Sequence, residues 1–395
     1  MRRVYLDHAA TTPVDPRVAE VALECMTGNY GNPSSLHQFG RLARQAVETA
    51  REQVAGLIGA AAKEVVFLSG GTEGDNLAIK GVAAALKKRG NHIITSAIEH
   101  HAVLHTCAYL EGAGFRVTYL PVDEHGLVRL SDVEAALAKE TILVTIMLGN
   151  NEVGTIQPIA DIARLTRARG IVLHTDAVQA TAQVPVNVDA LGVDLLTISG
   201  HKMYGPKGIG ALYIRRGTRL VPQALGGGHE HKLRAGTENV PGIAALGKAA
   251  ELARAELAER GRHLSALRDR FIRDIMERIP DVKLNGHPER RLPNNANLSF
   301  KYVEGEALLL NLDMRGIAVS SGSACTSGAL EPSHVLLAMG VPPEVAQGSL
   351  RFTFGQQNTD DDVDYVLQEL PAVVAKLREM SPFTPPQEEG GADVH

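Results

Sequence analysis

The stretch IVLHTDAVQATAQVPVNVDALGVDLLTISGHK, residues 171–202, contains two short apolar runs that each end in polar residues. The runs at residues 171–176 and 193–199 have the length and composition of strands buried on both faces of a parallel sheet. In open parallel sheets, ligands bind beyond the carboxyl ends of the strands. The polar residues that end each run are therefore candidates for a binding site.

The same alternation continues on both sides of this stretch, from about residue 60 to residue 215. Further strands are predicted at residues 65–69, 92–96, 116–120, 142–148 and 210–214. Helical patterns lie between several of these runs, for example at residues 76–88 and 159–169. Alternating strands and helices predict an α/β domain whose mostly parallel, seven-stranded sheet is covered on both faces.

The C-terminal third of the chain has a different pattern, which predicts a smaller α+β domain. Residues 242–279 are helix-rich, and beyond them strands are predicted at 297–302, 317–320 and 350–354, and helices at 306–314 and 361–376. We expect residues 16–260 to form the large domain, and residues 1–15 and 261–380 the small one. Residues 381–395 are rich in Pro, Glu and Gly, which predicts a mobile tail.

Composition excludes several classes of protein. The 395 residues suffice for two domains, and 44% hydrophobic and 22% charged residues are typical of a globular chain. The sequence has no run of about 20 apolar residues, so we expect no membrane contact. The formal charge of −5 gives no reason to expect direct nucleic-acid binding. The three cysteines, Cys25, Cys107 and Cys325, form no CxxC pair, which favours free thiols and a cytoplasmic location.

Polar clusters follow five of the predicted strands, at residues 69–74, 99–101, 149–152, 174–179 and 199–202. In the first, Gly70, Gly71 and Thr72 precede a helix, and backbone amides in such a turn favour an anion such as phosphate. An ordinary turn with Thr72 as helix cap is the alternative. In the last cluster, Lys202 sits among small residues, where its amine can form a Schiff base. A surface lysine is the alternative.

The remaining clusters offer a carboxylate, an amide and imidazoles. Asp176 ends a strand and needs a cationic partner, such as a protonated pyridine nitrogen, unless it only caps a helix. Gln179 can reach the same ligand. His100 can lie over an aromatic ring or transfer protons. His101 and His105 have the spacing for a metal on one helix face, but we find no convincing further ligands and expect no metal.

Three segments outside these clusters also carry candidate residues. Cys325 lies in Ser320-Ser-Gly-Ser-Ala-Cys-Thr-Ser-Gly, which predicts a mobile loop that presents a thiol. Cys25 and Cys107 lie in apolar helical patterns and are expected in the core. Arg351 is a lone cation in an apolar strand, suited either to a substrate carboxylate or to an internal ion pair. Arg234-Ala-Gly-Thr offers a further cation and hydroxyl in a glycine turn.

A lysine for a Schiff base, a carboxylate for a pyridine nitrogen and a phosphate-binding loop together describe a pyridoxal-phosphate enzyme. The chain resembles cysteine desulfurases of the NifS/IscS type, within the class V aminotransferase family, from residue 4 to about residue 355. The motifs that carry the resemblance are Tyr5-Leu-Asp-His-Ala-Ala-Thr-Thr-Pro, Gly31-Asn-Pro-Ser-Ser, Asn150-Asn-Glu-Val-Gly, His174-Thr-Asp-Ala-Val-Gln, Ser199-Gly-His-Lys-Met-Tyr-Gly-Pro-Lys-Gly, Arg234-Ala-Gly-Thr and Ser321-Gly-Ser-Ala-Cys-Thr-Ser. The resemblance implies the fold type I of pyridoxal-phosphate-dependent transferases.

The resemblance also implies a role for each matching residue. Lys202 would carry pyridoxal phosphate, His100 would stack on its ring and transfer protons, and Asp176 and Gln179 would bind its nitrogen and phenolic oxygen. The implied phosphate ligands are Thr72, Ser199, His201, the backbone of Gly71 and, from the other subunit of a homodimer, Thr237. Asn151 would contact cofactor and substrate, Asn32 the substrate, and Arg351 its carboxylate. Cys325 would form the persulfide, and could contact a nascent iron–sulfur cluster.

The implied reaction converts L-cysteine to L-alanine and passes its sulfur through an enzyme persulfide to an acceptor protein, for iron–sulfur cluster assembly or for tRNA or cofactor thiolation. An aminotransferase or selenocysteine lyase on the same scaffold is one alternative, but transamination has no use for the Cys325 loop. A non-catalytic sulfur scaffold is another, although it would need neither Lys202 nor Asp176. The chain departs from the family at Leu233 and Ala235, where arginine and serine are common, which affects only expected subunit contacts.

Overall fold

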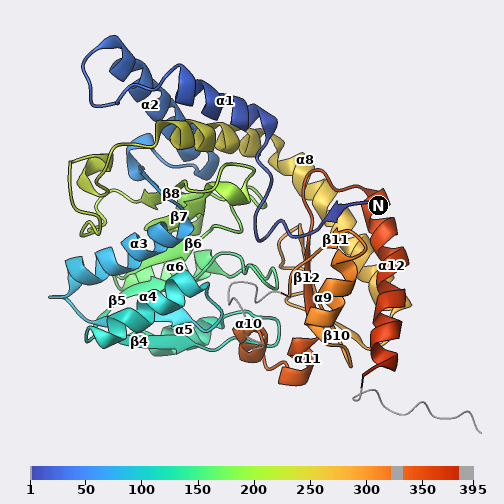
Figure 1. The fold of residues 1–395 in the computed structure, drawn as a ribbon. Helices are drawn as coiled ribbons and strands as arrows, with labels where there is room; N and C mark the ends of the chain where they lie inside the picture. The colour runs from blue at the N-terminus through green and yellow to red at the C-terminus, as the bar shows by residue number, and fades with distance from the viewer. Residues whose placement is uncertain (1, 322–331, 382–395) are drawn as a thin grey trace, which may run out of the picture.

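A seven-stranded sheet forms the centre of the larger part of the molecule (Figure 1). The computed structural model describes residues 2–321 and 332–381. In spatial order the strands are β2 (Val65–Leu68), β8 (Gly210–Ile214), β7 (Leu195–Ser199), β6 (Val172–Asp176), β5 (Thr141–Thr145), β3 (His92–Ser96) and β4 (Arg116–Leu120). Only β8 runs antiparallel to its neighbours. The predicted mostly parallel seven-stranded sheet is confirmed.

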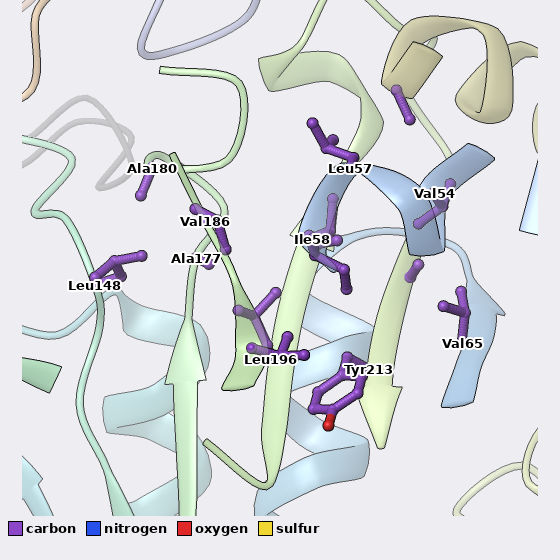
Figure 2. Packing of buried hydrophobic residues seen from close by; sticks show 14 of the residues in the cluster. Val54, Leu57, Ile58, Val65, Leu148, Ala177, Ala180, Val186, Leu196 and Tyr213 are labelled. Atoms are coloured by element: carbon purple, nitrogen blue, oxygen red, sulfur yellow. The ribbon is translucent and has the colours of Figure 1, made fainter. Parts of the chain in front are cut away.

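Alternating residues of these strands enter two apolar cores on opposite faces of the sheet. Val65 and Phe67 pack with α2 (Gln38–Ile58), α6 (Ile159–Ala168) and the first half of α8 (Val240–Arg278), a core shown in Figure 2. Val66 and Leu68 pack instead with α3 (Gly71–Leu86) and α4 (His101–Gly112). The period of two therefore buries both faces of the sheet, as a parallel sheet requires.

The C-terminal third builds a second core around a three-stranded antiparallel sheet of order β12-β10-β9. Its strands are β9 (Val282–Asn285), β10 (Asn295–Phe300) and β12 (Ser349–Thr353), and its helices include α9 (Gly305–Asp313) and α12 (Asp360–Glu379). The second half of α8 also packs here, so this 39-residue helix spans both cores (Figure 1). The short strand β9 was not predicted, because only its last residue is buried.

The N-terminal segment joins the second core although it precedes the large sheet in sequence. Strand β1 (Val4–Tyr5) pairs in parallel with β11 (Ile317–Ala318). The remaining helices are α1 (Pro16–Thr27), α5 (Leu130–Ala136), α7 (Val188–Leu191), α10 (His334–Ala338) and α11 (Pro343–Gln347). In the part of the chain that the structure describes, every helix is too short or too polar to span a bilayer.

A buried ion pair anchors the connection between β8 and α8 to the large core. Glu230 accepts two hydrogen bonds from Arg51, at 2.8 and 3.0 Å, and one from the backbone N–H of Phe67 at 2.7 Å. Glu230→Ala leaves the buried Arg51 guanidinium with only the exposed Glu48 carboxylate, 3.3 Å from its Nε, so we expect a loss of about 3–5 kcal/mol of unfolding free energy in urea. Asp189→Ala removes an exposed pair of similar length, with Arg215, and should have little effect. Equal losses in the two variants would contradict this interpretation.

Candidate active site

Lys202 lies just beyond the carboxyl end of β7, in a single turn of 3₁₀ helix formed by Gly200–Lys202. The half-buried Nζ atom donates hydrogen bonds to the carbonyl oxygens of Ala9, at 2.5 Å, and Ala10, at 2.7 Å. Thr12 strengthens this junction, since its N–H and its hydroxyl both donate to the carbonyl of His201. The amine is therefore held between the end of a core strand and the N-terminal segment.

The N-terminus of α3 lies against the ends of β6 and β7. A Cβ atom on Gly71 would come within 2.8 Å of the Val178 side chain and 3.7 Å of Ser199 Cβ, so only glycine fits without displacement. The N-cap residue Gly70 provides no side-chain cap, which leaves amides of the first turn, at Gly71 and Thr72, available to an anion. Ser199 is buried at the end of β7 beside them.

Asp176 ends β6 as a buried carboxyl group close to the charge of Lys202. Its Oδ1 accepts a hydrogen bond of 2.8 Å from the backbone N–H of Val178. Burial raises the pKa of Asp176 to about 6, while this hydrogen bond and the Lys202 charge act in the opposite direction. Gln179 Nε2 donates to the Ala9 carbonyl at 2.9 Å, the same oxygen that Lys202 contacts.

His100 is the N-cap of α4, and its Nδ1 accepts a hydrogen bond of 3.1 Å from the N–H of Ala102. Burial, together with the Lys202 charge, lowers the pKa of His100 to about 4. The ring is therefore neutral at pH 7 and carries its proton on Nε2. His201 Nδ1 is hydrogen-bonded to Thr11 Oγ1 at 3.2 Å, and burial with the Lys202 charge lowers its pKa to about 4 as well.

Arg351 on β12 has an internal ion pair, one of the two interpretations that its sequence left open. The residue is 3% exposed. Its Nη2 donates to Asp7 Oδ1 and its Nη1 to the Asn151 carbonyl, both at 2.9 Å. Its buried Nε has no hydrogen-bond partner among the described residues. The guanidinium is thus fixed on two sides and retains a donor for a further acceptor.

Among the described residues, the side chains of Asn32 and Thr237 make no hydrogen bond to this cluster. Asn32 is exposed in the connection between α1 and α2, which Figure 1 shows at the upper left and away from the sheet, and its Oδ1 accepts a hydrogen bond from the N–H of Ser34. Thr237 is exposed in the segment before α8, whose Arg234 pairs with Glu73. Cys325 lies outside the described residues.

Sequence reasoning gave no role to residues that hold the site from a distance in sequence. Asp7 contacts Arg351, and Ala9 and Ala10 contact Lys202. The N-terminal motif that contains them supported only the resemblance to the family. Two buried acids, Glu99 and Glu152, lie in the polar clusters at 99–101 and 149–152, but sequence reasoning assigned them no role. Burial raises the pKa of Glu99 to about 8 and that of Glu152 to about 7. Their local sequence did not indicate burial, because Glu99 precedes two histidines and Glu152 follows two asparagines.

The imidazoles of His101, His105 and His334 gather beside this site. The His101 ring centroid lies 4.9 Å from each of the other two. Across residues 2–321 and 332–381, we find no group of three or more His, Cys, Asp or Glu side chains that could hold a metal ion.

Comparison with known proteins identifies the family. The chain belongs to the class-V aminotransferases, whose family model matches residues 4–366. It is 55% identical to cysteine desulfurase IscS of Methanosarcina thermophila over 97% of this chain and 95% of that one. It is also 55% identical to cysteine desulfurase IscS of Dictyoglomus turgidum over 97% of each chain. A solved NifS-like protein is similar at 40% identity and a TM-score of 0.90, over 95% of this chain and 100% of that one.

Members of this family depend on pyridoxal phosphate, and the residues present fit that group. The fit rests on the amine of Lys202 and on the buried carboxyl group of Asp176, which lies close enough to feel the charge of that amine. It also rests on the uncapped N-terminus of α3, which packs so closely against Val178 and Ser199 that a Cβ on Gly71 would clash with Val178. Together these groups match an aldehyde, a pyridine nitrogen and a phosphate.

Proposed function

We propose that this chain is a pyridoxal-phosphate-dependent cysteine desulfurase that converts L-cysteine to L-alanine and retains the sulfur as a persulfide. The observation that carries the proposal is the meeting of Lys202, Asp176 and the N-terminus of α3 at the carboxyl ends of one sheet. Relatives that are 55% identical over nearly the whole chain are named cysteine desulfurases, which supports the same activity here.

The chain's own residues would divide the work as follows. Bound pyridoxal phosphate supplies an electron sink for the Cα atom of the substrate. Lys202 would hold the cofactor, and Asp176, when ionised, would pair with the cofactor's ring nitrogen. Gln179 would donate to the phenolic oxygen. Thr72, Ser199, His201 and the Gly71 amide would bind the phosphate. His100, neutral and protonated on Nε2, would move a proton.

Sulfur transfer needs a thiolate, which we assign to Cys325. The Cys325 sulfur would attack the substrate Sγ, so that an S–S bond forms while the substrate Cβ–S bond breaks. The electron pair of the broken bond remains on Cβ, which takes up a proton and becomes the methyl group of alanine. The balance is L-cysteine plus enzyme thiol giving L-alanine plus enzyme persulfide, with no external oxidant. Cys325 could then pass the sulfur on, or contact a nascent iron–sulfur cluster.

Incubation of the holoenzyme with L-cysteine tests this function directly. Alanine and protein-bound persulfide should appear together, in equal amounts in the first turnover. Alanine without bound sulfur, or a keto acid in place of alanine, would favour a lyase or an aminotransferase. Parallel incubation with L-selenocysteine would show whether selenium is also removed.

Arg351→Ala should weaken the binding of L-cysteine while the cofactor stays bound. A charge-assisted contact to the substrate carboxylate is worth roughly 1.5–3 kcal/mol, so the KM should rise about 10-fold to 150-fold. Steady-state kinetics and the visible absorbance of the cofactor would measure the two effects. Arg315→Ala removes an arginine that is paired with Glu369 on the small-domain side and serves as the control. An unchanged KM in Arg351→Ala would mean that the carboxylate is bound elsewhere.

We further propose a homodimer in which Thr237 completes the phosphate site of the other subunit, and we propose that Asn32 contacts the substrate. Both residues are exposed. Asn32 Oδ1 accepts a hydrogen bond from the Ser34 N–H, and Arg234, three residues before Thr237, pairs with Glu73 in the first turn of α3. Large apolar side chains are exposed on α1, on α2 and between them, which supports burial against a second copy: Leu23, Met26, Tyr30, Leu36 and Phe39. Size-exclusion chromatography with light scattering would test the dimer.

The domain division and the cellular setting are also proposals. The first half of α8 packs in the core of the large sheet and the second half in the core of the small sheet. This supports a large domain of residues 16–260 and a small domain of residues 1–15 and 261–380. The free buried thiols of Cys25 and Cys107 are consistent with the cytoplasm. The acceptor would be a protein, such as an iron–sulfur scaffold, with no direct nucleic-acid or membrane contact.

A further inference from the structure

We propose that Asp7 is a positioning residue: its carboxylate holds the Arg351 guanidinium in the orientation that receives the substrate carboxylate. The inference rests on the proposed function, because it assigns Asp7 to the carboxylate site of that reaction. It begins from the ion pair between Asp7 Oδ1 and Arg351 Nη2 at 2.9 Å. On its own, this pair would suggest that Arg351 is a structural residue and unavailable to substrate.

The ion pair with Asp7 does not satisfy all the hydrogen-bond donors of the Arg351 guanidinium. Nη1 donates to the Asn151 carbonyl and Nη2 to Asp7, so two acceptors fix the plane of the group from two sides. Nε is buried and has no partner in the described part of the chain. A buried charged donor without an acceptor is costly, so this geometry suits an anionic ligand that brings oxygen atoms.

Asp7 is itself held firmly enough to act as a support. Its carbonyl accepts hydrogen bonds of 3.0 Å from the Tyr5 hydroxyl and from the N–H of Ala10. Asp7 also forms a β-bridge to Thr353, two residues beyond Arg351 on β12. The Asp7 carboxylate therefore has a fixed place relative to the strand that carries Arg351.

The backbone of Arg351 is secured without Asp7, so the ion pair acts on the side chain alone. The N–H and the carbonyl of Arg351 pair with Ser320, at 2.7 and 3.2 Å, and β12 pairs with β10 on its other edge. Removing the Asp7 carboxylate should leave the strand in place and free only the guanidinium. The side chain of Asp7 is 20% exposed, so it can be truncated without opening a large cavity.

The test measures carboxylate binding apart from turnover. The probe is 3-mercaptopropionate, which carries the carboxylate and thiol of cysteine but lacks the amino group that reacts with the cofactor. In the holoenzyme, Asp7→Ala should raise the dissociation constant of this probe about tenfold by calorimetry, as expected for loss of a charge-assisted contact. The KM for L-cysteine should rise by a similar factor while kcat changes little. Glu369→Ala, which removes a 3.0 Å ion pair with Arg315, should leave both values unchanged.

Two further variants keep the inference falsifiable if Asp7→Ala unfolds. Asp7→Asn keeps an acceptor for Nη2 and should restore most of the probe affinity. In an Arg351→Ala background the Asp7 substitution should add nothing, because Asp7 acts only through Arg351. Unchanged or tighter probe binding in Asp7→Ala would overturn the inference, since Asp7 would then be idle or a competitor of the substrate. Probe binding that is tighter in Asp7→Asn than in wild type would overturn it in the same way. Failure of the wild-type holoenzyme to form alanine would instead overturn the proposed function.

Discussion

In Cys325→Ala, alanine formation and protein-bound sulfur are both expected to fall to background. The attack on the substrate sulfur needs a thiolate, and this substitution removes the one that we assign to it. The pyridoxal-phosphate site is untouched, so L-cysteine should still bind and perturb the visible spectrum of the cofactor. Alanine analysis and labelled sulfur from L-[³⁵S]cysteine measure the two products in the same sample.

The other two cysteines supply matched controls because burial makes both poor nucleophiles. Cys107 is fully buried on α4, and burial raises its pKa to about 12. Burial also raises the pKa of Cys25 on α1. Their alanine variants should lose packing stability but keep the desulfurase activity. Activity that survives in Cys325→Ala, or that disappears in Cys107→Ala with the fold intact, would overturn the assignment of the nucleophile.

The strands of the large sheet were predictable because their burial is recorded locally in the sequence. The runs 92–96 and 210–214, which are buried throughout, match β3 and β8 at both ends. The run 116–120 also matches β4, although only its last residue is buried. The run 142–148 extended too far, because Ile146, Met147 and Leu148 remain buried after the strand ladder of β5 ends at Thr145. An apolar run indicates that a segment is buried, but a buried segment near a site need not be paired as a strand.

The support of the site was harder to predict because it comes from residues far away in sequence. A sequence pattern can indicate that Lys202 ends a strand, but not that its amine meets the carbonyls of Ala9 and Ala10. These contacts exist because β1 pairs with β11, which brings the N-terminal segment beside the small sheet. The sequence could not decide between a substrate carboxylate and an internal ion pair for Arg351 for the same reason, since its partner Asp7 lies 344 residues away.

Lys202→Ala is expected to abolish activity and to release the cofactor. Wild-type protein should be yellow after dialysis, because the lysine that we assign to pyridoxal phosphate would hold it covalently. The variant retains the groups assigned to the phosphate and the ring nitrogen, so it should bind added cofactor but lose it on dialysis. Absorbance spectra before and after dialysis measure this loss. The fold should persist, since the Lys202 amine is half-buried and water can replace it at the Ala9 and Ala10 carbonyls.

Lys207 provides the control for Lys202, because it lies exposed in the same glycine-rich loop. Lys207→Ala should remain yellow and active. Borohydride reduction before dialysis then separates covalent from non-covalent binding: it should fix the cofactor to wild type and to Lys207→Ala, but not to Lys202→Ala. Cofactor that is fixed to Lys202→Ala by reduction would mean that another amine forms the bond. The buried carboxyl of Asp176, beside the Lys202 charge, would then need a different explanation.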